Sequence, residues 1–300
     1  MKHICRLTGE KKEFKNNEEY DKSMKAIGAL VRNRTRQARP NVSRVFVSRA
    51  PSTPSVMREV VTRKSYTPDV LRPEVPMPKN HVTQKFSLIH PSRGRVDQAY
   101  DCMKYWYGMM SPFNEVEYIL SIDHNDPSNY LKILEEDTEP FGFRLVRGKN
   151  ANVVQALNRG AKCATGDVLI YVSDDFLCPP NWDLEIQKNA EGDDWFMLVN
   201  DGIQKKFATI LIESRKYYKR LGYMYYPEYI SMFADPDATE MARAHGRLQD
   251  RTNLLFKHNH YTVGGMPFDA TYSNENSPVA WKHGEKLFEK RKKENFGVKI

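Results

Sequence analysis

Residues 167–175 read Asp-Val-Leu-Ile-Tyr-Val-Ser-Asp-Asp, an almost wholly apolar run that ends in two carboxylates. Runs of this kind are typical of strands that are buried on both faces of a parallel sheet. We expect further strands at residues 85–90, 115–123 and 141–147, and helices at residues 95–110, 128–135, 152–164 and 278–296. Strands that alternate with helices predict an α/β protein with a mostly parallel sheet flanked by helices.

The positive charge of the chain is concentrated near its N-terminal end. The 300 residues have a formal net charge of +8. Residues 1–84 carry 18 lysines and arginines against 8 acidic residues, as well as 7 of the 17 prolines, whereas residues 85–300 carry 28 against 30. We therefore predict a basic, largely extended arm over residues 1–84 and one folded domain over residues 85–300. The arm could contact polyanions such as nucleic acid, or it could be a solvated leader.

The composition argues against several classes of protein. No run approaches the ~20 apolar residues of a membrane-spanning helix. The charged N-terminal stretch does not fit a secretory signal. The four cysteines are far apart and include no Cys-x-x-Cys pair. This spacing does not suit a disulfide-stapled mini-domain or a zinc ribbon, and we expect a cytoplasmic protein.

Polar residues follow each expected strand, at the edge where open α/β sheets bind their ligands. Pro91, Ser92 and Arg93 follow the first strand and could hold phosphate, although Ser92 could equally cap the next helix. Asp123 ends the second strand and could accept a hydrogen bond from a base or a ribose. Two adjacent carboxylates at the end of a buried strand repel each other, and a bound divalent cation would remove that cost.

The stretch from Ala156 to Gly160, followed by Ala164, Gly166 and the strand that ends in Ser-Asp-Asp, resembles the nucleotide-sugar-binding block of the family-two glycosyltransferases, which have a GT-A fold. The resemblance implies that Asp175 is a metal ligand and that Asp174 contacts the ribose or the metal shell. It also implies that Asp123 binds the nucleotide base. It further places Pro91, Ser92 and Arg93 in the donor pocket, to which we also assign Asn152. This chain departs from the family pattern at Ser173, the first position of the DxD-like motif, and at Leu157, where the family usually has arginine.

A second block, Phe-Ala-Asp-Pro-Asp at residues 233–237, is similar to the acidic motif of the same family. Gly246 lies eleven residues after Asp235, as in that motif, and the resemblance implies that Asp235 is the catalytic base. Ala234 replaces the usual glutamate. From the residues alone, Asp235 before Pro236 also predicts a helix cap, so both roles stay open.

Two further groups complete the candidate site. His258 and His260 are two residues apart, and on a strand both would face the same way. The resemblance implies that one of them is a further metal ligand, and they could also be ordinary polar strand residues. Asp201 and Gly202 follow another apolar run and could bind the acceptor, or they could form a plain turn.

The resemblance implies an inverting, hexosyltransferase-like enzyme that uses Mn²⁺ or Mg²⁺ and moves a sugar from a nucleotide diphosphate donor, most often a UDP-sugar, to an acceptor hydroxyl. The acceptor could be a saccharide, a protein or a nucleic acid. One alternative is a DNA-modifying enzyme that glycosylates a hydroxylated base with help from the arm. Another is an inactive GT-A-like protein that is kept for binding or assembly. A nucleotidyltransferase fits less well, because no glycine-rich phosphate loop lies near the first strand.

Overall fold

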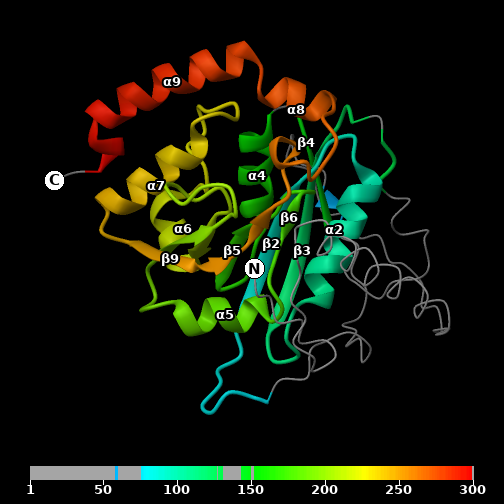
Figure 1. Cartoon of the computed structure of the whole chain (residues 1–300), viewed down its shortest axis with the longest axis vertical. Helices are drawn as coiled ribbons and strands as arrows, with labels where there is room; N and C mark the ends of the chain where they lie inside the picture. Colours follow the sequence, from blue (N-terminus) through cyan, green and yellow to red (C-terminus); the bar gives the residue numbers. More distant parts are fainter. Residues whose placement is uncertain (1–57, 60–75, 127, 131–142, 150–151, 299–300) are drawn as a thin grey trace.

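The computed structural model describes residues 58–59, 76–126, 128–130, 143–149 and 152–298 (Figure 1). Its strands are β1 (Arg58–Glu59), β2 (Lys85–Pro91), β3 (Glu115–Asp123), β4 (Phe143–Gly148), β5 (Val168–Tyr171), β6 (Phe176–Leu177), β7 (Phe196–Asn200), β8 (Ile212–Ser214), β9 (Leu248–Leu255) and β10 (Lys257–His258). Its α-helices are α2 (Val96–Gly108), α4 (Val153–Ala161), α5 (Trp182–Asn189), α6 (Arg215–Leu221), α7 (Ala234–Ala244), α8 (Ala270–Glu275) and α9 (Pro278–Lys293). Two 3₁₀ turns, η1 (Tyr261–Val263) and η2 (Asn295–Gly297), are also present.

The main sheet has eight strands in the order β1-β4-β3-β2-β5-β8-β7-β9. The central strands β4, β3, β2 and β5 pair in parallel. Only β1 and β8 run against the others within this described sheet. The predicted α/β fold with a mostly parallel sheet is therefore confirmed. A separate two-stranded ribbon of β6 and β10 lies next to the ends of β5 and β9 in the chain.

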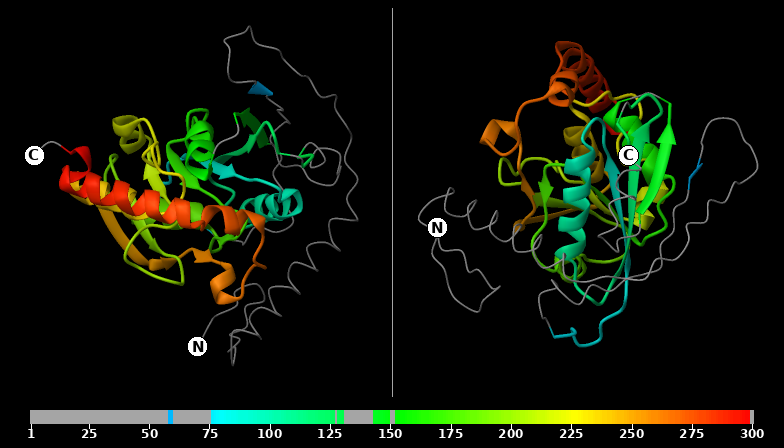
Figure 2. Two further views of the ribbon diagram at one scale, coloured as in Figure 1. Left: turned by 90° about the horizontal axis from the view of Figure 1, so that it is seen from above. Right: turned by 90° about the vertical axis from the view of Figure 1, so that its right-hand side faces the viewer.

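Helices cover both faces of the sheet, and the side chains of β2 explain why. Phe86 and Leu88 belong to the core on the side of α2 and α5, which contribute Trp106 and Trp182. Ile89 belongs to the opposite core, which α4, α6 and α7 complete. Alternate residues of one strand thus enter two cores, as expected for a central strand that is buried on both faces. Helix α9 packs outside α7 (Figures 1 and 2).

Most of the predicted elements lie where the sequence placed them, and one is shorter. Strand β3 spans the predicted residues, whereas β5 ends at Tyr171 and the chain turns over residues 174–175 before β6. The ring of Tyr171 lies edge-on to that of Phe176 across this turn, with 5.3 Å between centroids, and Val172 between them is still part of the core. Most of the helix expected at residues 128–135 lies outside the described residues.

The N-terminal arm is described only in part. Residues 58–59 form β1, which pairs antiparallel with β4, while residues 1–57 and 60–75 lie outside the described residues. The last residues before β2 contact the body: His81 Nε2 lies 3.0 Å from the Phe113 carbonyl, and the Gln84 amide donates to Asn114. The boundary at residue 84 and the extended character of the arm stay predictions.

No helix in the described residues is long and apolar enough to cross a membrane. Cys102, Cys163 and Cys178 are free thiols. The expected cytoplasmic location stays a prediction.

Candidate active site

The segments that follow β2, β3 and β5 meet at one edge of the sheet. The parallel register pairs Pro91 at the end of β2 with Ser121 near the end of β3. It also pairs Ile89 with Tyr171, so that the turn at Asp174 and Asp175 follows beside the end of β2. Carboxyl ends of parallel strands share an edge, and this brings together most of the residues that the sequence analysis assigned to the donor.

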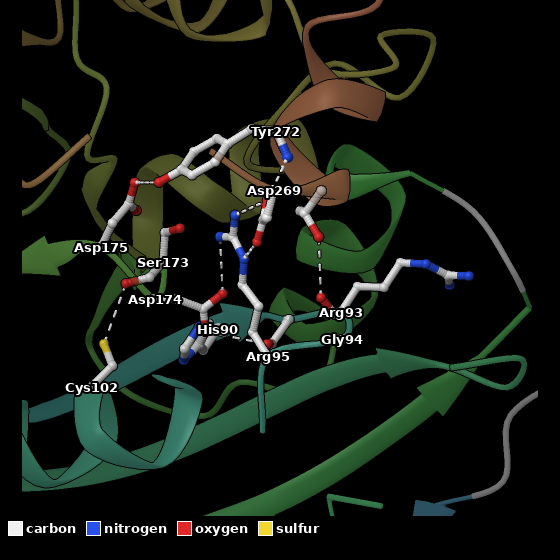
Figure 3. Close-up of polar contacts among 12 residues, drawn as sticks. His90, Arg93, Gly94, Arg95, Cys102, Ser173, Asp174, Asp175, Asp269 and Tyr272 are labelled. Atoms are coloured by element: carbon white, nitrogen blue, oxygen red, sulfur yellow. Dashed lines mark hydrogen bonds and ion pairs between the residues drawn. The ribbon is translucent and has the colours of Figure 1, made fainter. Parts of the chain in front are cut away.

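Asp174 lies in a buried polar cluster on this edge (Figure 3). Its side chain is 4% exposed, and its Oδ1 atom lies 2.9 Å from His90 Nε2. Ser92 Oγ donates to the same carboxylate at 3.2 Å, and Arg95 Nη1 lies 3.4 Å from Oδ2. A buried carboxylate needs such partners, because burial without them would strongly disfavour its charge. Asp174 is therefore fixed in position.

Arg95 links this cluster to α8 near the C-terminal end of the chain. Its guanidinium is 5% exposed and donates two hydrogen bonds of 2.7 Å to the two oxygens of Asp269. It also lies 4.4 Å from the ring centroid of Tyr272. A bidentate arginine–carboxylate pair is geometrically specific, and it holds α8 over the ends of the central strands (Figure 3).

Asp175 faces the ribbon of β6 and β10. Its Oδ2 atom lies 3.0 Å from His258 Nε2 and accepts a hydrogen bond of 2.7 Å from the Tyr272 hydroxyl. Burial opposes its ionisation, but the contacts with His258 and Tyr272 prevail and hold the pKa of Asp175 well below its ordinary value. Its Oδ1 atom is buried and has no hydrogen-bond partner among the described residues.

The donors at Asp175 fit a divalent cation. The unused Oδ1 atom is a carboxylate oxygen, which suits Mg²⁺ and Mn²⁺, and His258 Nε2 stands beside the same carboxylate. His260 is less well placed than the sequence suggested. It precedes η1 instead of lying on the strand, and its Nδ1 atom is 2.9 Å from Thr262 Oγ1. Within the described residues, no group of three or more His, Cys, Asp and Glu side chains is arranged to hold a metal.

Asp123 lies between two arginines. Arg93 Nη1 is 3.1 Å from Oδ2, and Arg159 Nη2 is 3.2 Å from Oδ1. The departure at Leu157 is structural, because this side chain is fully buried in the core while Arg159 turns toward the strand end. Asn152 accepts a hydrogen bond from the Gln155 amide and is the N-cap of α4, so the structure gives its side chain a helix-capping contact.

The structure corrects the expected capping role of Asp235. Helix α7 begins at Ala234, and its N-cap is Phe233 in a left-handed conformation with φ of 69°. Asp235 is the second helical residue, and Pro236 is tolerated after it because the first helical N–H groups have no partner within the helix. Burial raises the pKa of Asp235 to about 6. A carboxyl with a pKa near neutrality can serve as a general base.

The other acidic candidates are occupied by structural contacts. Asp201 is buried and accepts hydrogen bonds from the amides of Ile203 and Gln204 and from the Thr209 hydroxyl, so its carboxylate shapes its own loop. Gly202 has a φ of 82°, a conformation that favours glycine in this turn. The Asp201 carbonyl also accepts from the His258 amide, which places this turn against β10.

Sequence reasoning missed several residues of the site. The structure adds Arg95, Asp269, Tyr272, Arg159 and Glu275. Burial raises the pKa of Glu275, at the end of α8, to about 7. Arg95 follows the loop that the sequence analysis assigned to the donor, and this position could have identified it as a residue of the site. The residues of α8 belong to a polar segment with no apolar period, so nothing in their pattern pointed to the site.

Comparison with known proteins agrees with this geometry. The family model described as "Glycosyl transferase family 2" matches residues 104–260, which is more than half of the chain. The chain belongs to glycosyltransferase family 2. No curated protein sequence matches this glycosyltransferase in a sequence search.

Solved structures are similar to the enzyme in fold. One is S. aureus TarS 1–349 in complex with UDP-GlcNAc, with a TM-score of 0.51 and 14% identity, covering 68% of this chain and 65% of that chain. Another is the mannosyltransferase PcManGT from Pyrobaculum calidifontis in complex with GDP-Man and Mn²⁺, with a TM-score of 0.47 and 12% identity over 73% and 77% of the two chains. The family and the similarity to TarS agree with the predicted GT-A fold.

Proposed function

We propose that this glycosyltransferase moves a sugar from a nucleotide diphosphate donor to an acceptor hydroxyl, with inversion and with a divalent cation, Mn²⁺ or Mg²⁺. The observation that carries the proposal is Asp175: an ionised, buried carboxylate with one unused oxygen beside His258. Such an oxygen is costly to bury unless a cation or another donor binds it. The contacts of Asp175 therefore favour an active enzyme over an inactive assembly protein.

Asp175 and His258 would hold the cation in this proposal, with His260 as a further candidate from the neighbouring turn. Mg²⁺ and similar ions are usually bound through one or two carboxylates together with substrate phosphates, so a small set of protein donors is sufficient. When bound, the cation supplies a Lewis acid that stabilises the diphosphate leaving group. Asp174, which His90 and Arg95 hold in place, lies next to this position and would contact the ribose.

Asp123 would recognise the nucleotide base, with Arg93 and Arg159 fixing its carboxylate. Pro91 and Ser92 would line the same pocket, and Asn152 stays a candidate next to it. We propose a UDP-sugar as the donor and a hexose as the transferred group, as in the usual chemistry of the family. The structural neighbour TarS, which binds UDP-GlcNAc, is consistent with this choice.

Asp235 would act as the general base. Its carboxylate would take the proton of the acceptor hydroxyl while that oxygen bonds to the anomeric carbon. The bond between the anomeric carbon and the diphosphate breaks in the same step, and the nucleoside diphosphate leaves with the bonding electrons. No covalent sugar–enzyme intermediate is required. Asp201 and Gly202 stay proposed acceptor contacts through the backbone of their turn, since the Asp201 carboxylate is occupied.

Calorimetry of UDP binding with and without Mn²⁺ tests the proposal. The parent protein should bind UDP more tightly with Mn²⁺, and Asp175→Asn should remove that gain because an amide oxygen is a much weaker cation ligand. Asp193→Asn is the matched control, since Asp193 is an exposed aspartate that pairs with Lys216 and has no assigned role in the site. Equal Mn²⁺ dependence in Asp175→Asn and the parent would contradict the assignment of the metal ligand. If the protein hydrolyses no member of a panel of UDP- and GDP-sugars, the proposed activity is contradicted.

A further inference from the structure

Four aromatic side chains form a continuous layer beside the candidate active site. We define this aromatic platform as His260, Tyr261, Phe268 and Tyr272. The ring centroid of Tyr261 lies 4.2 Å from that of His260, 4.9 Å from that of Phe268 and 4.8 Å from that of Tyr272. Phe268 and Tyr272 are nearly parallel, with an angle of 17° between their planes. Contacts of this kind order each ring against its neighbours.

The platform runs from the buried reaction centre to the surface. At its inner end Tyr272 is 4% exposed and donates its hydroxyl hydrogen bond to Asp175. The ring of His260 lies 4.8 Å from that of His258, which in turn interacts electrostatically with Asp235. At its outer end Phe268 is 59% exposed. A ligand that touched Phe268 would therefore lie at the outer end of a row of rings whose inner end contacts Asp175.

The ring of Phe268 packs on Tyr261 and Tyr272, yet more than half of this residue stays exposed to solvent. A large apolar side chain costs free energy when it faces water, and an ordered aromatic surface next to converging polar groups is typical of a ligand site. We propose that Phe268, supported by Tyr261 and Tyr272, is the acceptor-binding surface and that the acceptor is a neutral saccharide whose pyranose ring lies against it. This inference rests on the glycosyl transfer proposed above.

The charge around the platform distinguishes a saccharide from a nucleic acid. Residues 258–277 contain Asp269 and Glu275 but no lysine or arginine. The guanidinium of Arg95, which lies over the Tyr272 ring, is already engaged by Asp174 and Asp269. Surfaces that stack nucleic-acid bases combine aromatic rings with lysines and arginines that neutralise phosphates, and an acidic neighbourhood repels the phosphate backbone. A neutral sugar ring carries no such charge, and its C–H groups can pack on the negative face of an aromatic ring.

Ring removal at Phe268 tests the inference in the full-length chain. Saturation-transfer NMR with a panel of methyl hexopyranosides measures acceptor binding directly and needs no donor. We expect Phe268→Ala to weaken binding of the panel member that binds best by about three- to tenfold, and to raise KM for that acceptor by a similar factor. Phe268→Trp should retain binding. Val263→Ala, which shortens another exposed apolar side chain of the same segment, should behave as the parent.

The outcomes separate this inference from the function on which it rests. Donor hydrolysis without acceptor should be the same in Phe268→Ala and the parent, because the ring contacts found for Phe268 in the described part of the chain are with Tyr261 and Tyr272. Saccharide binding that is absent from the parent, or that is unchanged in Phe268→Ala, overturns the inference even if nucleotide sugars are hydrolysed. Sugar transfer to oligonucleotides alone would also overturn it. Saccharide binding without hydrolysis of any nucleotide sugar would instead refute the proposed transfer reaction.

Discussion

Replacing Asp235 by asparagine separates a catalytic role of this residue from a structural one. Asp235 is the second residue of α7 and not its cap, so the helix does not depend on its side chain. No ion pair to its carboxylate is found among the described residues, and asparagine has nearly the same volume and shape. Asp235→Asn should therefore fold normally, whereas an amide cannot accept the proton of the acceptor hydroxyl.

Asp235→Asn should lower the rate of sugar transfer strongly and should raise the stability of the folded protein. General-base catalysis typically contributes about 10²–10⁴-fold, and transfer at neutral pH should fall by that factor. Burial raises the pKa of Asp235 from 3.8 to about 6 in the folded protein. Ionisation at this site then costs roughly 3 kcal/mol at most, a cost that is absent below the unfolded pKa and complete above the folded one. Asp235→Asn should therefore be more stable than the parent at pH 8 and equally stable near pH 3.5.

Three measurements on one preparation check these expectations: the pH dependence of the thermal midpoint, the affinity for UDP, and the initial rate of sugar transfer. UDP affinity should persist, because the base acts on the acceptor. In the parent, transfer should decline as the pH falls below about 6, where the carboxylate takes up a proton. Glu240→Gln, at an exposed position of the same helix, should resemble the parent throughout. Transfer by Asp235→Asn at the parental rate would eliminate Asp235 as the base, and Glu275 would become the next candidate.

Two further predictions concern stability and the arm. Glu213 is fully buried on β8, neither of its oxygens has a hydrogen-bond partner in the described residues, and burial raises its pKa well above the ordinary 4.5. The stability of the parent should therefore fall as the pH rises above 4.5, because ionisation of Glu213 is disfavoured in the folded state. Urea unfolding should show Glu213→Gln to be about 1–3 kcal/mol more stable than the parent at pH 8 and no more stable near pH 4. Residues 1–84 carry 18 lysines and arginines against 8 acidic residues, and we propose that they contact polyanions. Their deletion should abolish salt-sensitive retention on DNA while donor hydrolysis continues, and retention that survives would locate the polyanion contact on the body.

The sequence predicted the sheet well because its central strands are buried on both faces. The strands β2 and β3 contain the apolar stretches Leu88–Ile89 and Tyr118–Leu120, and both strands are buried over most of their length, as expected in a sheet covered on both faces. The end of β5 was harder to predict. The apolar run continues to Val172, whose amide still donates to the Ile89 carbonyl, although the assigned strand ends at Tyr171. The chain then turns at Asp174 and Asp175 before β6, and an apolar run does not mark where such a turn begins.

The candidate site was predictable where its residues follow strands and obscure where they come from elsewhere. Asp123, Asp174 and Asp175 sit at strand ends, and the topology alone brings strand ends together. The contact between Arg95 and Asp269 joins residues 174 positions apart, and the six-residue helix α8 has no periodic signal of its own. The cap predicted at Asp235 was wrong for a related reason. The left-handed turn at Phe233 starts the helix two residues earlier, and no local rule anticipates a phenylalanine in that conformation.

The acidic residues near the candidate site differ in their contacts and in the direction in which their pKa values are shifted. The Asp237 carboxylate is bound by Arg291 at 2.6 Å and by the Tyr229 hydroxyl, and this buried pair ties the start of α7 to the end of α9. Asp175 keeps a depressed pKa through His258 and Tyr272, so it remains an anion that can face a cation. Asp235 and Glu275 have pKa values raised by burial to about 6 and 7, and both act electrostatically on the buried Tyr171. Carboxyls whose environments drive their pKa values apart are suited to different steps of one reaction. In the proposed reaction Asp175 would be the anion that faces the metal and Asp235 the carboxyl that takes the acceptor's proton, and α7, which carries Asp235, is anchored by the separate ion pair between Asp237 and Arg291.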